Sequence, residues 1–409
     1  MPELMREWNL SPVEGGLIGS YGFFGMMLGA ICFGVLADWF GRRNVLVVSV
    51  FLFSVFMFLC AFATGPVSFS LFRFVGGVGI GGIMPNVLAL LTDYAPTRLR
   101  NTMTGIVLCC FSLGSILAPA LALLMLPGLG WRSLYWVAIL PVPFLPFMVR
   151  HFRESPAVLL ARGRTDELRA LLARVNPDAA IALDAELEVG TRQSPGGLPL
   201  AELFRNRRAL ATIMIGVAFF MCLLMINGLT IWLPGFMVGA GYALGSGLPF
   251  LIILNVGAVA GTLVLGRLAD RWGTKRVLIP MFVVSAVALS LLGFADGFAI
   301  LAVLVFVAGA CTTGSQNIAY SFVSQYYRPS MRATGIGLAS AVGRVGAIVG
   351  PTYGGILLSL SLPAELNFVS FAVPGVIAAL AFWFVRAGAT PGQEVSEPLP
   401  AVADSRGAS

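Results

Sequence analysis

Two stretches decide the fold of this chain: GVLADWFGRR at residues 34–43 and GRLADRWGTK at residues 266–275. They lie 232 residues apart and share Leu-Ala-Asp, flanking glycines and basic residues at the same positions. The same offset superposes six residues that follow each motif: Tyr94, Arg100, Thr102, Gly114, Ile116 and Pro119 fall on Tyr326, Arg332, Thr334, Gly346, Ile348 and Pro351. Because one offset aligns motifs that lie so far apart in the chain, it indicates two copies of one structural unit.

The composition excludes a water-soluble protein. Of the 409 residues, 58% are hydrophobic and only 11% are charged, whereas soluble domains carry about 25% charged residues. A compact soluble fold of this length could not hide so much apolar surface. The chain is therefore predicted to be an all-α, polytopic integral membrane protein.

Eleven stretches are long and apolar enough to cross a membrane, which takes about 20 residues for a helix. Several contain glycine or proline, as expected for membrane helices that pack closely. The stretches cover residues 14–36, 45–64, 67–92, 103–126, 133–149, 209–235, 245–268, 277–295, 298–323, 333–360 and 366–385.

The basic residues predict the orientation, because cytoplasmic loops are rich in lysine and arginine. If the loop at residues 38–44 is cytoplasmic, only Arg6 and Arg132 lie outside, and only Arg73 and Arg344 lie within spans. All other basic residues then face the cytoplasm. We expect an outer N-terminus and a cytoplasmic C-terminus, in the inner membrane of a bacterium.

The spans fall into two groups. Residues 1–150 are predicted to form a five-span bundle and residues 209–386 a six-span bundle. Between them, residues 151–208 carry many charges and are expected to form a partly helical cytoplasmic linker. Residues 387–409 are rich in proline, alanine and glycine and are expected to be a disordered cytoplasmic tail.

The repeat offset leaves the sixth span, residues 209–235, without a first-half counterpart, which would precede residue 4. We therefore expect a six-plus-six architecture from which the first helix is missing. A misassigned start or a truncation is one explanation, and a true eleven-span protein is the other.

Several functional classes are disfavoured. The net charge of +7 comes without a basic cluster interleaved with aromatic residues, so no nucleic-acid partner is expected. The six cysteines lie inside apolar runs without metal-ligand spacing, and His151 is the only histidine. We expect neither an enzyme nor a cofactor or metal site.

The repeated motif resembles the signature of the major facilitator superfamily. That resemblance implies two helical bundles that rock against each other, so that a central site opens to either side in turn. It also implies that charges at the motif turns latch the bundles. The gating and coupling candidates are Asp38, Arg42, Arg43, Arg73, Asp93, Arg100, Asp270, Lys275 and Arg332.

Within the superfamily, the chain resembles the aromatic acid:proton symporters over almost its whole length, although sugar porters share several of the patterns. The stretches that carry this resemblance are Trp8-x-Leu10-Ser11-Pro12, residues 25–30 (GMMLGA), 73–86 (RFVGGVGIGGIMPN), 94–100 (YAPTRLR), and 332–335 and 343–351 (RATG and GRVGAIVGP).

Two arginines stand inside predicted spans, where an unpaired charge costs several kcal/mol and often marks a transport pathway. Arg344 lies near the middle of its span, and a guanidinium can bind a carboxylate with two hydrogen bonds; a structural ion pair is the alternative. Arg73 matches an arginine that the superfamily associates with proton movement; snorkelling to the interface is its alternative.

Other polar and aromatic residues within spans are candidates to line a substrate site, and ordinary packing or interhelical hydrogen bonding is the alternative for each. They are Tyr21, Asn86, Asn227, Trp232, Asn255, Gln316, Asn317 and Tyr320.

The sequence thus predicts a secondary transporter that imports an aromatic or related carboxylate, with protons as the coupling ion, and we expect a monomer surrounded by lipid. No acid lies deep in a span, so proton coupling is the least supported part. A carrier of the same fold for a sugar or another organic ion, and a non-transporting product, stay open as alternatives.

Overall fold

The computed structural model describes residues 2–94, 99–152, 154, 159–160, 165–169, 203–204, 208–239, 244–295, 297–327, 329–360 and 362–385. The predicted tail and most of the predicted linker lie outside these ranges. The described residues form helices and turns and contain no strand.

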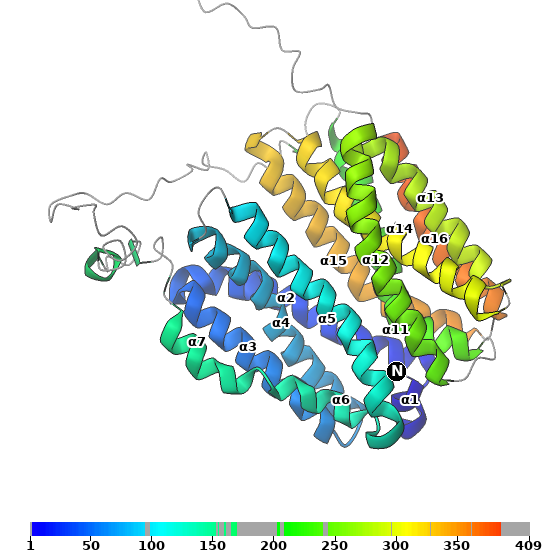
Figure 1. Cartoon of the computed structure of the whole chain (residues 1–409), viewed down its shortest axis with the longest axis horizontal. Helices are drawn as coiled ribbons and strands as arrows, with labels where there is room; N and C mark the ends of the chain where they lie inside the picture. The colour runs from blue at the N-terminus through cyan, green and yellow to red at the C-terminus, as the bar shows by residue number, and fades with distance from the viewer. Residues whose placement is uncertain are drawn as a thin grey trace, which may run out of the picture.

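The first half contains four long helices and a broken one (Figure 1). Its elements are α1 (Pro2–Trp8), α2 (Pro12–Phe40), α3 (Arg42–Leu59), η1 (Cys60–Phe62), α4 (Pro66–Tyr94), α5 (Arg100–Leu129), α6 (Arg132–Trp136), η2 (Val137–Ile139), η3 (Val142–Phe144) and α7 (Leu145–His151).

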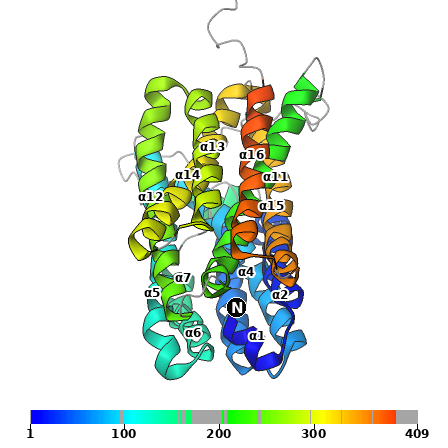
Figure 2. The ribbon, with the colours of Figure 1, turned by 90° about the vertical axis from the view of Figure 1, so that its right-hand side faces the viewer.

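The second half contains six long helices, which lie beside the first half in Figures 1 and 2. They are α11 (Arg208–Gly239), α12 (Leu244–Trp272), α13 (Thr274–Leu292), α14 (Phe298–Tyr326), α15 (Pro329–Ser359) and α16 (Ala364–Phe384).

Eleven segments within the described residues are long and apolar enough to cross a membrane, as the sequence predicted. Large apolar side chains are exposed on their flanks; Val67, Leu124 and Trp383 are 82%, 80% and 67% exposed. Lipid can cover such a surface and water cannot. The chain is a multi-pass membrane protein.

The fifth span departs from a continuous helix. Between Arg132 and His151 the chain forms α6, two 3₁₀ turns and α7. Pro141, Pro143 and Pro146 lie in this stretch, and each proline removes a backbone donor and crowds the preceding turn. The apolar length therefore predicted the span but not its breaks.

The two repeated motifs form the same turn. Gly41 and Gly273 have φ of +89° and +90°, where a glycine has no steric penalty. Each donates its N–H to the carbonyl of the motif alanine, Gly41 to Ala37 at 3.0 Å and Gly273 to Ala269 at 2.9 Å. We call the end of the molecule that carries these two turns the motif end.

A second repeated feature is the close contact of glycine-bearing helices. A Cβ on Gly25 or Gly29 of α2 would overlap a carbonyl oxygen of α4, and a Cβ on Gly257 or Gly261 of α12 would overlap one of α14. The two pairs are related by the offset of 232 residues. Each half is thus built on one pair of helices whose backbones touch.

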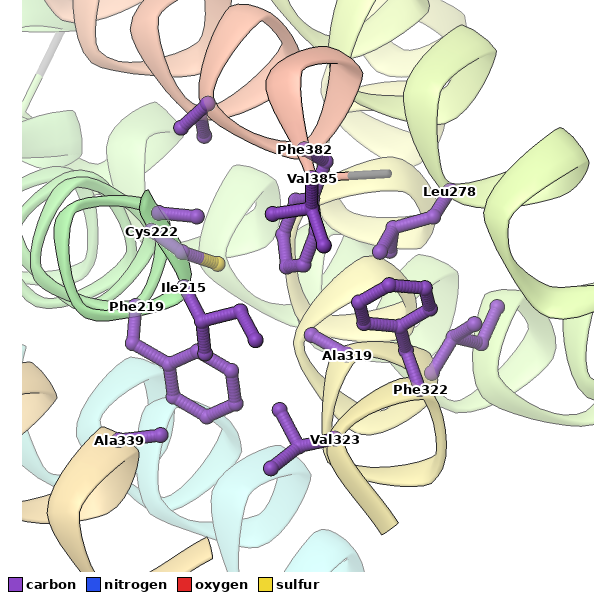
Figure 3. Packing of buried hydrophobic residues seen from close by; sticks show 14 of the residues in the cluster. Ile215, Phe219, Cys222, Leu278, Ala319, Phe322, Val323, Ala339, Phe382 and Val385 are labelled. Atoms are coloured by element: carbon purple, nitrogen blue, oxygen red, sulfur yellow. The ribbon is translucent and has the colours of Figure 1, made fainter. Parts of the chain in front are cut away.

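Aromatic and aliphatic side chains fill the motif end of the second half. Phe219, Phe322, Val323 and Phe382 come from three helices and are almost fully buried (Figure 3). This packing holds α11, α13, α14, α15 and α16 as one unit.

The halves meet along α2 and α15, at the end of these helices away from the motif turns. The hydroxyl of Ser20 donates to the carbonyl of Ile348 at 2.5 Å and lies 2.8 Å from the Thr352 hydroxyl. A Cβ on Gly16 would approach the carbonyl oxygen of Pro351 to 2.5 Å. Together with the packing of α5 on α12, this contact joins the two halves.

Candidate functional site

Arg344 lies in the middle of α15 and points across the boundary between the halves. Its side chain is half-buried, and its Nη1 lies 3.4 Å from the carbonyl oxygen of Met26 on α2. Because a backbone carbonyl carries no net charge, this contact does not compensate the positive charge of Arg344, and no acid pairs with it in the part of the chain that the structure describes. The guanidinium is available to an anion that reaches the boundary.

Arg73 approaches α2 from the other side. It extends from α4, and its Nε and Nη2 atoms lie 3.5 Å from the place of a Cβ on Gly22. Its Nη1 lies 3.5 Å from the Tyr135 hydroxyl, and its buried Nε has no hydrogen-bond partner among the described residues. Glycine at position 22 leaves the room that this guanidinium occupies.

The structure brings the two intramembrane arginines to neighbouring turns of one helix. Arg73 packs over Gly22 and Arg344 reaches Met26, and these two α2 residues are four apart. Four residues of an α-helix rise about 6 Å. Each guanidinium is a positive charge within the membrane, and an anion bound near it relieves the cost of that charge.

Arg73 also lines a cavity of about 460 Å³ between the halves, away from the motif end. Phe69, Trp131 and Tyr135 form its aromatic side, with ring centroids 5.5–5.9 Å apart in edge-to-face geometry. Thr230 of α11 and Leu251 of α12 close it from the second half. Glu3 of α1 also lines the cavity, which therefore holds one cation, one acid and several ring edges and suits a small, largely apolar ligand.

Tyr320 and Gln316 belong to the same region of the second half as Arg344. The Tyr320 hydroxyl lies 3.4 Å from the Ser340 hydroxyl, which sits one helical turn before Arg344 on α15. Gln316 lies one turn before Tyr320 on α14. Because α14 and α15 run in opposite directions, Gln316 lies at the same level as Arg344. Both amide atoms of Gln316 are buried without a partner among the described residues. Gln316 therefore has hydrogen-bonding capacity left for a ligand.

The other candidate lining residues have structural partners. The Asn86 amide donates to the carbonyls of Gly82 and Phe33, at 2.8 and 3.5 Å, and so joins α4 to α2. Asn317 donates to the Thr262 hydroxyl at 3.0 Å and joins α14 to α12. Asn227 and Asn255 donate to carbonyls of their own helices.

Two aromatic candidates lie away from the arginines. Trp232 is almost fully buried and donates its indole N–H to the Pro351 carbonyl at 2.7 Å. This bond fastens α11 to α15. Tyr21 is 46% exposed and lines an apolar groove between α2 and α4.

The motif cations make their hydrogen bonds within their own halves. Arg43 donates from Nη2 to the carbonyl of Val149 in α7. Lys275, its counterpart at the repeat offset, donates to the carbonyls of Trp383 and Val385, at 3.1 and 2.5 Å, at the end of α16. Cations stabilise helix C-termini. Each motif turn is thus fastened to the last helix of its own bundle.

For the remaining gating candidates, the structure gives the exposure of three side chains. Asp270 and Arg332 are exposed, and Arg42 is half-buried. The side chains of Asp38, Asp93 and Arg100 lie outside the described part of the chain. A latch between the bundles stays a prediction.

Glu154 is a motif partner that the sequence reasoning did not single out. Its carboxylate accepts the backbone N–H of Arg43 at 3.2 Å, in the first turn of α3. Gly41 precedes that helix and has no side chain to cap it, so the carboxylate serves as the cap. The sequence feature that could have identified Glu154 is its position as an acid directly after the last apolar span of the first half.

A polar contact fastens α1 to the turn before α6. Trp131 donates its indole N–H to Glu7 at 2.5 Å, and Arg132 pairs with the same carboxylate at 2.7 Å. The Trp131 hydrogen bond is the largest cause that holds the pKa of Glu7 below its ordinary value; desolvation, the next largest, raises it, and Arg132 lowers it further.

We expect this contact to lose its stabilising effect in acid. A carboxylate with a lowered folded-state pKa stabilises the fold above its unfolded pKa and loses that effect as the pH falls through the folded value. Because the groups are about two-fifths exposed, the effect is small, about 0.5 kcal/mol. Thermal unfolding of wild type and Glu7→Gln should differ at pH 7 and converge below pH ~4; a difference that persists in acid would contradict the assignment.

Comparison with known proteins agrees with this architecture. The Major Facilitator Superfamily model matches residues 1–261 and 250–405. The benzoate transport protein of Acinetobacter baylyi is 36% identical over 94% of this chain and 84% of its own length. The gentisate transporter of Corynebacterium glutamicum is 34% identical, over 92% of this chain and 80% of its own length.

Solved structures share the fold at low sequence identity. A bacterial homologue of the human lysosomal transporter Spinster covers 95% of this chain and 93% of its own, with a TM-score of 0.71 and 16% identity. A D-xylose-proton symporter covers 95% and 91%, with a TM-score of 0.69 and 19% identity. With its two repeated bundles and a family match over almost its whole length, this chain belongs to the major facilitator superfamily.

Proposed function

We propose that the chain is a secondary transporter that imports an aromatic or related carboxylate across the bacterial inner membrane. The observation that carries the proposal is the convergence of Arg73 and Arg344 on neighbouring turns of α2, at the boundary between the halves. Alternating access needs a binding site at such a boundary, because rocking of the halves then exposes it to each side in turn.

The chemistry of this region supports an aromatic acid over a neutral sugar. A guanidinium offers a planar pair of donors to a carboxylate, and the cavity beside Arg73 is lined mainly by apolar and aromatic side chains. A sugar needs many hydrogen-bonding groups around its ring. The named relatives that transport benzoate and gentisate support the same substrate class.

Within this proposal, the N-terminus faces outward and the motif end faces the cytoplasm, with a linker at residues 151–208 and a tail at 387–409. The substrate moves together with protons, and the transporter acts as a monomer in lipid. Arg344, Gln316 and Tyr320 contact the substrate, and Arg73 couples binding to the approach of the halves.

Uptake into proteoliposomes tests the proposal. With an inward proton gradient, radiolabelled benzoate should accumulate with saturable kinetics, and a protonophore should collapse the accumulation. Unlabelled gentisate should compete and glucose should not. Competition by glucose without any by benzoate would replace the proposal with a sugar carrier, and accumulation that survives the protonophore would remove proton coupling.

A further inference from the structure

The two repeats differ in how their motif ends are packed. In the second half, three phenylalanine rings from α13, α14 and α16 contact one another. The ring centroids of Phe282 and Phe382 are 5.9 Å apart and those of Phe322 and Phe382 are 5.4 Å apart. All three side chains are buried, and Figure 3 shows Phe322 and Phe382 between their helices. These rings fill the space between the three helices.

The first half has no ring at any of the three corresponding positions. At the offset of 232 residues, the phenylalanines of the second half are replaced, in chain order, by Val50 of α3, Leu90 of α4 and Arg150 of α7. Leu90 and its neighbour Leu91 are partly exposed, whereas their counterparts on α14 are buried. The space that the rings fill in the second half is therefore not filled by the first half.

This difference leaves a groove of about 400 Å³ between α3, α4 and α7. Tyr94 and Phe152 on its rim are 40% and 38% exposed, so the groove opens to the surface of the bundle. An apolar groove of this kind in a membrane is suited to an acyl chain, since lipid and not water borders it. Its lining consists of Leu46, Val87, Leu90, Leu91, Tyr94, His151 and Phe152.

Basic side chains stand at the end of α7 beside this groove. Arg150 and His151 are the last two residues of α7, and both are exposed. Arg43 donates to the carbonyl of Val149 and so adds a second guanidinium next to them. Glu154 is the acid of this region, and its carboxylate caps the start of α3. Two arginines and a histidine beside one engaged acid favour an anionic ligand.

We propose that this groove, which we call the α7 groove, binds one anionic phospholipid from the leaflet at the motif end. One acyl chain lies along the apolar lining, and the phosphate contacts Arg150 and His151. The His151 ring is held at the rim, because it stacks on Phe147 at 4.0 Å and its Nδ1 lies 3.0 Å from the Phe147 carbonyl oxygen. Basic sites between membrane helices recognise anionic headgroups in this way.

The lipid thus has the same structural role in the first half that a side-chain core has in the second. Phe322 and Phe382 join α14 to α16 directly, whereas the acyl chain joins α4 to α7. The phosphate takes the end of α7 where arginine replaces phenylalanine. The proposal concerns lipid binding and is independent of the transported substrate.

Native mass spectrometry of the full chain in detergent tests the proposal. The chain is mixed with equal amounts of phosphatidylglycerol and phosphatidylcholine that carry the same acyl chains. An arginine near an anionic headgroup strengthens binding by about fivefold, so the wild type should retain the first phosphatidylglycerol about tenfold better than phosphatidylcholine. Arg150→Gln should lower that preference by about fivefold. The matched control Arg276→Gln, which removes an exposed arginine at the motif end of the second half, should leave it unchanged.

Filling the groove is the second test. Leu90→Phe introduces the ring that α14 carries at the same repeat position, so it should displace the first phosphatidylglycerol. Leu124→Phe on the exposed surface of α5 is its control and should keep the lipid bound. If Leu90→Phe does not fold, the comparison of Arg150→Gln with Arg276→Gln decides alone.

Four results would overturn the proposal. They are equal retention of the two lipids by the wild type, an unchanged preference in Arg150→Gln, an equal loss in Arg276→Gln, and retention of phosphatidylglycerol by folded Leu90→Phe. A dimer that Leu90→Phe dissociates would instead assign the α7 groove to a second copy of the chain.

Discussion

Replacing Arg344 by alanine is expected to lower benzoate uptake at limiting substrate concentration by at least about thirtyfold. Removing one partner of a desolvated, hydrogen-bonded charge pair costs about 2 kcal/mol or more, and each 1.4 kcal/mol is a factor of ten. Among the described residues, Arg344 donates to a neutral carbonyl of α2. Its removal should therefore destabilise the fold little, while the substrate loses the cation that binds its carboxylate. Initial uptake rates in proteoliposomes measure the effect.

Two further variants separate a binding role from a structural one. Arg344→Lys keeps the charge and loses the planar pair of donors, so uptake should recover in part through a raised KM. Arg276→Gln removes an exposed arginine elsewhere and should leave uptake unchanged. If Arg344→Ala transports normally, or if it unfolds while Arg344→Lys does not, the residue has no direct role in substrate binding.

The second large effect concerns the contact between α2 and α4. Gly29→Leu is expected to destabilise the protein by about 3 kcal/mol or more, because its side chain would enter the backbone of Val78. Gly261→Leu in α12 should do the same, because its side chain would enter the backbone of Ala310. Thermal unfolding in detergent should shift down by roughly 6–12 °C, or the variants should fail to fold.

Gly34→Leu is the matched control for these glycines. Gly34 lies on the same helix as Gly29, but no atom lies within 4 Å of the place of its Cβ. The substitution also removes a glycine from a helix, which is mildly stabilising. Its melting temperature should therefore equal or exceed that of wild type. If Gly29→Leu and Gly34→Leu melt alike, close backbone contact is not what holds α2 on α4.

The sequence predicted many of the residues of the candidate site, but not how they are arranged in space. Arg344 and Arg73 stood out because charges in apolar spans are costly. That both reach α2 one turn apart depends on three helices distant in the chain. Trp232 was a plausible lining residue by its type and position, yet its indole N–H is bonded to the Pro351 carbonyl inside the second half.

The amino-acid sequence was enough to predict the membrane class, the eleven spans, the two copies of one bundle and the loops that contain Gly41 and Gly273. These properties depend on local composition and on one repeat offset, and both are visible in a linear chain. The tertiary structure alone decided which sides of the helices meet. Membrane helices are apolar all round, because lipid is as apolar as the protein interior, so no stripe in the sequence marks the buried side. The hydrogen bond from Arg43 to the Val149 carbonyl and the capping of α3 by Glu154 follow from that packing.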